Sequence, residues 1–260
     1  MTDLVLTEDR GPVRHVILNR PQKRNAFDGD LVVATGRARR EAAADDGVRC
    51  VVVRGAGPMF SSGMDLAALG AVAAAPQNLR AFRRECLDAF DIAETMAKPT
   101  ICRIHGACIG GALELALACD LRVAAADAVM GLPETRIGLI PDVGGSSRLP
   151  ALVGLGRAKE MIMTGRFVDG TEAERIGLVN RVAAAEDLDD ATDGLVGELL
   201  ACAPIAVGLA KRVMDAAARP ALAATLEMEI TAQQVCALSA DFSEGAQAFR
   251  EKRQREFSGR

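Results

Sequence analysis

One charged residue interrupts an otherwise apolar segment in the middle of the chain. Glu114 is the only charged residue between Arg103 and Asp120, and its neighbours are leucines and alanines. A helix that is apolar on every side is a buried helix. Burying an ionisable side chain is costly unless it is paired or used. Glu114 is therefore either ion-paired to an arginine elsewhere in the chain or an acid–base group in an apolar cleft.

Two glycines, Gly110 and Gly111, directly precede this predicted helix. The first N–H groups of a helix have no partner within the helix and lie at the positive end of its dipole. Glycine also lets a ligand approach the backbone closely. The arrangement suits an anion, here an oxygen atom that becomes negative during a reaction.

Two further carboxylates, Glu134 and Asp142, each follow a proline in sequence that is otherwise mostly apolar. Carboxylates on facing segments can add and remove protons at neighbouring carbon atoms. Asp142 has a second interpretation, because a side chain just before the helix expected near Gly145 can cap that helix.

Strand and helix signals alternate through the first part of the chain, and helical signals dominate the rest. Apolar runs rich in β-branched residues predict strands at 13–18, 50–55, 100–104 and 121–125, with a weaker candidate at 178–181. Apolar residues at helical spacing predict helices at 28–44, 76–97, 112–118, 188–201, 205–218, 222–240 and 243–257. We expect an α/β core with the active site over residues 1–190 and a helical region over residues 191–260.

Composition argues against several other classes of protein. The 31 basic and 35 acidic residues give a net charge of −4, whereas nucleic-acid binders usually carry a basic excess. No uncharged stretch approaches the roughly 20 apolar residues of a membrane span. No secretory signal is visible, so we expect a cytoplasmic protein without membrane contact.

Cysteine and histidine usage adds two expectations. The seven cysteines lack a C-x-x-C pair, and we expect buried thiols in a reducing compartment. The only histidines are His15 and His105, so we expect no metal site. The sequence also lacks G-x-G-x-x-G, Gly-Lys and G-x-S-x-G, the motifs of dinucleotide, P-loop and hydrolase-elbow sites. Carboxylates remain as the obvious catalytic candidates.

Several segments together resemble the crotonase superfamily, the enoyl-CoA hydratase/isomerase family. They occur in family order over nearly the whole chain: NRPQKRN at 19–25, FSSGMDL at 60–66, KPT at 98–100, HGACIGGALE at 105–114, LPETRIGLIP at 132–141 and EGAQAFREKR at 244–253. The resemblance implies a crotonase-like ββα superhelix with a helical C-terminal oligomerisation region. It also implies a homotrimer or homohexamer.

The resemblance further implies an acyl-CoA thioester substrate and no separate cofactor, because coenzyme A is part of that substrate. The backbone N–H groups of Met64 and Gly111 would hold the thioester oxygen. Glu114 matches the glutamate that activates water for attack at Cβ in family hydratases, and Glu134 matches the one that delivers a proton to Cα. The first hypothesis is therefore that the chain is an enoyl-CoA hydratase, which acts on a trans-2-enoyl-CoA through an enolate.

Coenzyme A would lie along two loops in this family. Lys23 and Arg24 would contact its phosphates, although a solvated turn is the alternative, and Ala26 belongs to the same loop. The loop from Ser62 through Asp65 to Leu66 would hold the adenine through backbone groups.

Asp142 is a departure from family hydratases, which usually carry glycine there. An acid at this position is similar to the pattern of dienoyl-CoA isomerases. The second hypothesis is therefore a dienoyl-CoA or enoyl-CoA isomerase that uses Glu134 and Asp142. A third hypothesis is a non-catalytic acyl-CoA-binding subunit, which would not require the two glutamates.

Overall fold

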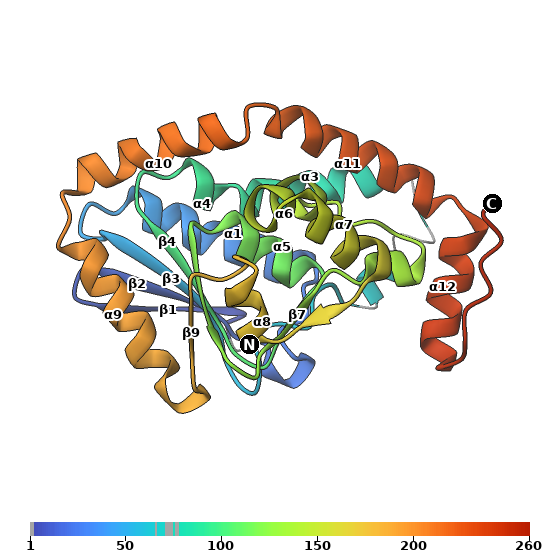
Figure 1. Ribbon diagram of the computed structural model, residues 1–260, viewed down its shortest axis with the longest axis horizontal. Helices are drawn as coiled ribbons and strands as arrows, with labels where there is room; N and C mark the ends of the chain where they lie inside the picture. Colours follow the sequence, from blue (N-terminus) through green and yellow to red (C-terminus); the bar gives the residue numbers. More distant parts are fainter. Residues whose placement is uncertain (1–2, 66, 71–74, 76–77) are drawn as a thin grey trace.

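Six strands form the main sheet, in the order β1-β2-β3-β4-β6-β9 (Figure 1). Their bounds are β1 Val5–Arg10, β2 Val13–Leu18, β3 Cys50–Gly55, β4 Thr100–Ile104, β6 Leu121–Ala125 and β9 Arg181–Ala183. β1 pairs antiparallel with β2, and the other neighbours run parallel. The computed structural model describes residues 3–65, 67–70, 75 and 78–260.

Helices cover this sheet and explain the apolar runs of its strands. The helix α1 (Gly29–Ala44) packs against β1 and β2, and α9 (Leu188–Leu200) packs against β3, β4, β6 and β9. Every residue from Cys50 to Val53 is buried, as expected for a parallel strand with both faces covered. Asp28 caps α1 by accepting the N–H of Leu31.

A smaller sheet of three short strands leads into the glycine pair Gly110 and Gly111 and has the order β5-β7-β8. The strands are β5 Ala107–Ile109, β7 Val129–Gly131 and β8 Phe167–Val168. The N–H of Gly110 donates to Gly131 O over 2.9 Å, which extends the pairing of β5 with β7. This sheet therefore fixes the backbone at the two glycines that precede the next helix.

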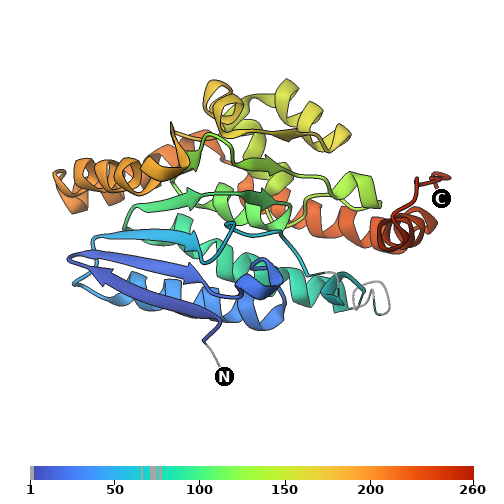
Figure 2. The same ribbon diagram turned by 90° about the horizontal axis from the view of Figure 1, so that it is seen from below.

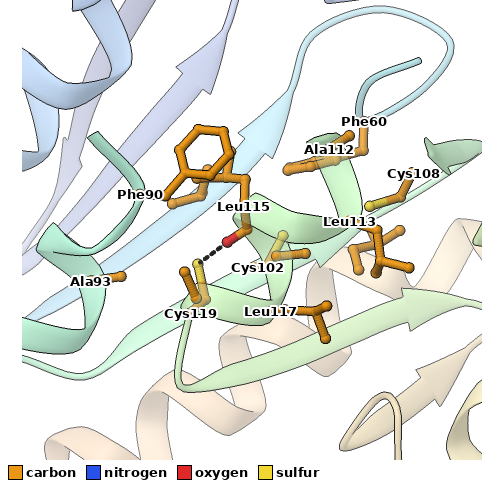
Figure 3. Packing of buried hydrophobic residues seen from close by; sticks show 14 of the residues in the cluster. Phe60, Phe90, Ala93, Cys102, Cys108, Ala112, Leu113, Leu115, Leu117 and Cys119 are labelled. Carbon is orange, nitrogen blue, oxygen red and sulfur yellow. Dashed lines mark hydrogen bonds between the residues drawn. The ribbon is translucent and has the colours of Figure 1, made fainter. Parts of the chain in front are cut away.

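That helix, α5 (Gly111–Ala118), is buried on all sides, as its sequence predicts. Leu113, Leu115 and Leu117 lie among buried side chains such as Phe60 and Phe90 (Figure 3). The helix supplies the centre of the hydrophobic core, and Glu114 is its one charged side chain.

The second half of the chain is largely helical, as expected. After the short turn η3 (Glu134–Ile137) come α6 (Gly145–Val153), α7 (Leu155–Thr164) and α8 (Gly170–Arg175), and η4 (Ala185–Asp187) leads into α9. The helices α10 (Pro204–Ala218) and α11 (Leu222–Ala237) extend along one side of the molecule, and α12 (Ala240–Glu251) turns down at their end (Figures 1 and 2). Residue 190, the expected end of the core, lies inside α9.

Four predicted elements were wrong in their bounds. The strand expected at 178–181 begins only at Arg181, because the N–H groups of Leu178 and Val179 donate to Ala173 O in a turn after α8. The helix expected at 243–257 spans 240–251, since Lys252 takes a left-handed conformation (φ 55°) and ends it. Beyond it the chain folds back, and Asp241 accepts the N–H groups of Ser258 and Gly259.

The helix expected at 76–97 is two helices, α3 (Leu79–Phe90) and α4 (Ile92–Thr95), and Pro76 lies outside the described residues. The helix expected at 222–240 ends at Ala237. The strands at 13–18, 50–55, 100–104 and 121–125 are confirmed.

The cysteines follow the expectation in part, since all seven are free thiols and five are buried, but Cys202 is exposed and Cys236 is partly exposed. Among the described residues, no helix by itself has the length and apolarity to cross a membrane. The bent pair 185–200 and 204–218 meets that criterion only when the two helices are combined. The described residues also contain no group of three or more His, Cys, Asp or Glu side chains that could hold a metal ion.

Candidate active site

A cavity of about 390 Å³ opens where α5 begins. Its walls come from the loop after β3, the start of α5, η3, α3 and the C-terminal helices. The predicted site residues that line it are Ser62, Met64, Gly111, Glu114, Glu134 and Asp142. Gln233 of α11 and Phe249 of α12 close another side, so the C-terminal region contributes to the cavity.

Two backbone N–H groups are available at this cavity, those of Met64 and Gly111. Neither donates a hydrogen bond to any part of the chain that the structure describes. A Cβ on Gly63 would lie 2.4 Å from Ile109 O and 3.6 Å from Gly111 N, so the loop passes close to the start of α5. Gly63 also has a φ of +89°, and both features require glycine there. The two donors are thereby brought to one place, as the resemblance implies.

Glu114 lies deep in this cavity, with 2% of its surface exposed. Its Oε1 accepts two N–H groups from the start of α6, those of Val143 and Gly145, each over 2.9 Å. Burial raises the pKa of Glu114, and these two N–H groups oppose that shift. Within the described residues Glu114 has no ion pair, so the ion-pair interpretation was wrong.

Glu134, like Glu114, lies close to the glycine pair. A Cβ on Gly110 would lie 2.7 Å from Glu134 Oε1, whereas a Cβ on Gly111 would lie 4.0 Å from Glu114 Oε2. Burial and then the charge of Glu114 raise the pKa of Glu134 well above its usual value. The pKa of both carboxyl groups is thus raised by burial, and only Glu114 has backbone N–H donors that favour its anion.

Asp142 is a buried ion-pair partner of Arg83 on α3, and both side chains are 3% exposed. The capping interpretation was wrong, because the N-cap of α6 is Gly144 and no side chain caps it there. Asp142 instead lines the cavity with Glu114 and Glu134. Burial raises its pKa to about 8 even though Arg83 opposes the shift.

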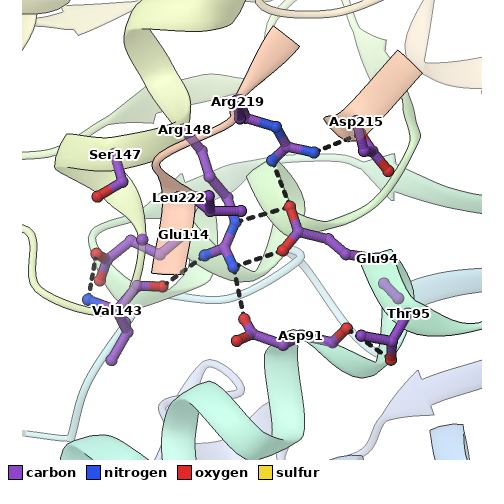
Figure 4. A network of polar contacts seen from close by, with 12 residues as sticks. Asp91, Glu94, Thr95, Glu114, Val143, Ser147, Arg148, Asp215, Arg219 and Leu222 are labelled. Carbon is purple, nitrogen blue, oxygen red and sulfur yellow. Dashed lines mark hydrogen bonds and ion pairs between the residues drawn. The ribbon is translucent and has the colours of Figure 1, made fainter. Parts of the chain in front are cut away.

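A polar network behind the cavity holds the backbone at Val143, which donates to Glu114 (Figure 4). Arg148 of α6, 1% exposed, donates to Val143 O over 3.0 Å. It also donates to Glu94 over 2.8 Å and to Asp91 over 2.5 Å. Because Val143 is one of the two donors to Glu114, the network links Glu114 to α4 and, through Arg219, to the end of α10.

The two loops expected to hold coenzyme A lie side by side. The N–H of Ser62 donates to Arg24 O over 3.0 Å, and that of Asp65 donates to Phe27 O over 2.8 Å. Lys23 and Arg24 are exposed, and neither has an ion pair within the described part of the chain. Ala26 is 8% exposed, and Leu66 lies outside the described residues.

Two residues that fix these loops, Arg20 and Asn25, were not predicted from the sequence. Arg20 donates to Ala26 O and to Asp65, each over 2.9 Å. Asn25, fully buried with a φ of 52°, donates to Met59 O and Phe60 O, each over 3.0 Å. Both stand in the NRPQKRN segment, whose resemblance was the available signal.

Arg83, Arg148 and Glu229 were also missed. Each is a charged residue on a helix whose sequence contains both apolar and polar residues, and its partner is far away in sequence. Nothing in the local pattern distinguishes such a buried charge from a solvated one.

These groups define what the site can do chemically. Two adjacent N–H donors stabilise an oxyanion, while two carboxyl groups in different surroundings can give and take protons. The combination suits proton transfer at carbons beside a carbonyl group.

Comparison with known proteins gives a consistent answer. A family model described as enoyl-CoA hydratase/isomerase matches residues 8–260. The chain is 40% identical to human enoyl-CoA hydratase domain-containing protein 2, mitochondrial, over 97% of this chain and 87% of that protein. It is 33% identical to crotonyl-CoA hydratase of Syntrophomonas wolfei, over 97% of each chain.

Among solved structures, carnitinyl-CoA hydratase from Mycobacterium avium matches with a TM-score of 0.88 and 32% identity, over 100% of both chains. The expected fold, an α/β crotonase-like core with a helical C-terminal region, is thereby confirmed.

The raised pKa of Asp142 predicts a specific pH dependence of stability. Between about 3.8 and about 8 the folded state holds a proton on Asp142 that the unfolded chain has released. The free energy of unfolding therefore falls as pH rises through this window. Asp142→Asn removes that contribution, so the variant should show a flatter pH dependence in urea denaturation. Exposed Asp190→Asn serves as the control, and parallel curves for wild type and Asp142→Asn would contradict the raised pKa.

Proposed function

The chain belongs to the enoyl-CoA hydratase/isomerase family, and from that premise we propose that it is an enoyl-CoA hydratase. Its substrate is a trans-2-enoyl-CoA thioester, and the product is the 3-hydroxyacyl-CoA. The observation that carries the proposal is the pair Glu114 and Glu134, which flank the two free N–H donors in one cavity.

The N–H groups of Met64 and Gly111 polarise the thioester carbonyl and stabilise the enolate that forms when water attacks Cβ. Glu114, as the anion held by Val143 and Gly145, takes a proton from the attacking water. Glu134, whose pKa is raised by burial and by Glu114, delivers a proton to Cα. The elements of one water molecule are added, and no redox or metal step is needed. We propose no cofactor beyond the coenzyme A of the substrate.

The loops around Ala26 and Ser62 support a coenzyme A site at the mouth of the cavity. Lys23 and Arg24 are exposed cations beside that loop and would contact the phosphates. The backbone of Ser62 and Asp65, with neighbouring Leu66, would hold the adenine. The free thiols support a reducing compartment, and we propose the cytoplasm.

A second candidate function is isomerisation of a dienoyl-CoA, and the position of Asp142 favours it. Asp142 lines the same cavity as Glu134. One of the two, as a carboxylate, can remove a proton from Cα, and the other, as a carboxylic acid, can deliver a proton at the far end of the conjugated chain. The same two N–H donors would stabilise the dienolate. A third candidate, a non-catalytic acyl-CoA-binding subunit, gives no reason for burying the glutamates.

Self-association is part of the proposal. Large apolar side chains remain exposed on the outer side of α10 and α11, namely Ile205, Leu209, Val213, Met214, Met228, Val235 and Leu238. Phe249 of α12 is also 48% exposed, whereas Leu226 and Ile230 of α11 pack inside the chain. A monomer seldom exposes so much apolar surface, so we propose a homotrimer or a homohexamer.

The proposed mechanism predicts the effect of changing either glutamate. Glu114→Gln and Glu134→Gln keep the shape and remove the proton function, so each should lower kcat for hydration at least about 10²-fold. Binding of the CoA ester, measured by calorimetry, should stay close to wild type. Exposed Glu186→Gln is the matched control and should be fully active. Near-normal hydration by Glu114→Gln would overturn the mechanism.

The next prediction separates hydratase from isomerase. Wild type should hydrate 2-enoyl-CoA rapidly, followed at the absorbance of the conjugated thioester, and leave 3,5-dienoyl-CoA unchanged. Asp142→Asn should then keep most of the hydration, because Asp142 takes no part in it. Rapid dienoyl isomerisation without hydration, lost in Asp142→Asn, would establish the isomerase. No turnover of either ester, with binding intact, would favour the binding subunit.

Assembly gives a further prediction. Light scattering at micromolar concentration should show a trimer or a hexamer of the 27.3 kDa chain. A double variant Val235→Ser, Leu238→Ser removes two exposed apolar side chains and should weaken the assembly. Arg212→Ser, an exposed polar change on α10, is the control. A wild-type monomer would contradict the proposal.

A further inference from the structure

A buried carboxylate of the C-terminal region reaches the backbone that holds Glu114. Glu229 of α11 is only 4% exposed. Its Oε2 accepts the N–H of Gly144 over 2.7 Å, and its Oε1 accepts the N–H of Ser147 over 2.6 Å. Neither the sequence patterns nor the proposed mechanism assigns this residue a role.

The first turn of α6 is shared between two carboxylates. Val143 and Gly145 donate to Glu114 Oε1, while Gly144 and Ser147 donate to Glu229. The N–H groups of one short backbone segment thus alternate between the two acids. These are the groups that a helix leaves without internal partners, and no side chain within α6 caps them.

A second contact from α11 holds the same segment. Gln233, one helical turn after Glu229, accepts the N–H of Ile140 over 2.9 Å. The residues from 140 to 147 are therefore fastened to α11 at three N–H groups and to Glu114 at two others. Moving the turn away from α11 would also move the two donors away from Glu114.

We propose that Glu229 is a positioning residue for the catalytic base: it holds the first turn of α6 so that Val143 and Gly145 keep Glu114 in its reactive orientation. This inference rests on the proposed function, in which Glu114 activates water. It ties the reaction to the C-terminal helix, although Glu229 itself does not line the cavity.

The charges around Glu114 define what Glu229 should change. Arg83 of α3 and Arg148 of α6 favour its anion. The charge of Glu114 raises the pKa values of Glu134, Asp142 and Glu229. Repulsion between two anions acts on both, so removing the negative charge of Glu229 should lower the pKa of Glu114. A helix cap with only a structural role would change stability and leave kcat per folded site unaltered.

The test compares Glu229→Gln, Glu229→Leu and the control Glu227→Gln in the full-length assembly. Glu227 stands on the same helix but is exposed and paired with Arg80 and Arg84. Loss of orientation typically costs up to about 10²-fold in rate, and we expect Glu229→Leu to lower kcat per folded site by at least about 10-fold. KM should stay near wild type, and Glu229→Gln, which keeps one acceptor oxygen, should lie between.

Infrared titration supplies a readout that needs no turnover. The carboxylic acid band that disappears in Glu114→Gln reports the protonation of Glu114 in the resting protein. Its titration midpoint should move to lower pH in Glu229→Gln, which removes a negative charge, and stay fixed in Glu227→Gln. Glu229→Leu removes the same charge and both acceptor oxygens, so weaker hydrogen bonds from Val143 and Gly145 should place its midpoint above that of Glu229→Gln. A folded Glu229→Leu with wild-type kcat and the same midpoint as Glu229→Gln would overturn the proposal. If Glu229→Leu fails to fold, kcat per folded site of Glu229→Gln decides. If wild type hydrates no enoyl-CoA, the proposed function fails and the infrared midpoint still tests the positioning.

Discussion

The structure depends on the hydrogen bonds that satisfy one carboxyl group buried in an apolar helix. Glu114 stands in α5, whose other side chains form the centre of the hydrophobic core. A buried charge is tolerated only when other groups replace the hydrogen bonds of water. Two N–H groups at the start of α6 do this, and a hydrogen bond to a charged group contributes about 1.5–3 kcal/mol. The first turn of α6 must therefore sit against α5, and much of the remaining polar packing serves to hold it there.

That packing is a chain of buried charges with no single dominant pair. Arg148 joins Val143 O to Glu94 and Asp91, and Arg219 reaches Glu94 from the end of α10 (Figure 4). Removing one partner of a buried pair typically costs about 3–5 kcal/mol because it leaves the other charge uncompensated. At Asp91 the two opposing effects act on one group, since burial raises its pKa while the charge of Arg148 opposes the shift. The network fixes the geometry of the site more than it adds to stability.

The sequence predicted the parts of this arrangement that are local. The strand at 50–55 and the helix at 112–118 could be predicted because each is an unbroken apolar run, and Gly110 and Gly111 marked the start of that helix. The strands β5, β7 and β8 have three residues or fewer, too short for any periodicity to show. Partners such as Glu229 and Gly144 are 85 residues apart, and only the fold brings them together. For Asp142 the local pattern favoured a helix cap, whereas the distant Arg83 on α3 determined its actual contact.

The number of charges in the cavity explains how one site can supply both an acid and a base. Three carboxyl groups, Glu114, Glu134 and Asp142, line the cavity together with three arginines, of which Arg83 is paired with Asp142. Burial raises the pKa of all three carboxyl groups, and the charge of Glu114 raises those of Glu134 and Asp142 further. Two N–H groups donate to Glu114 and favour its anion, whereas Glu134 Oε2 has no hydrogen-bond partner among the described residues. Asp142 is the group whose state depends on Arg83. Asp142 therefore helps to raise the pKa of Glu134 without needing to touch the substrate, and its contribution to chemistry depends on whether the conjugated chain reaches it.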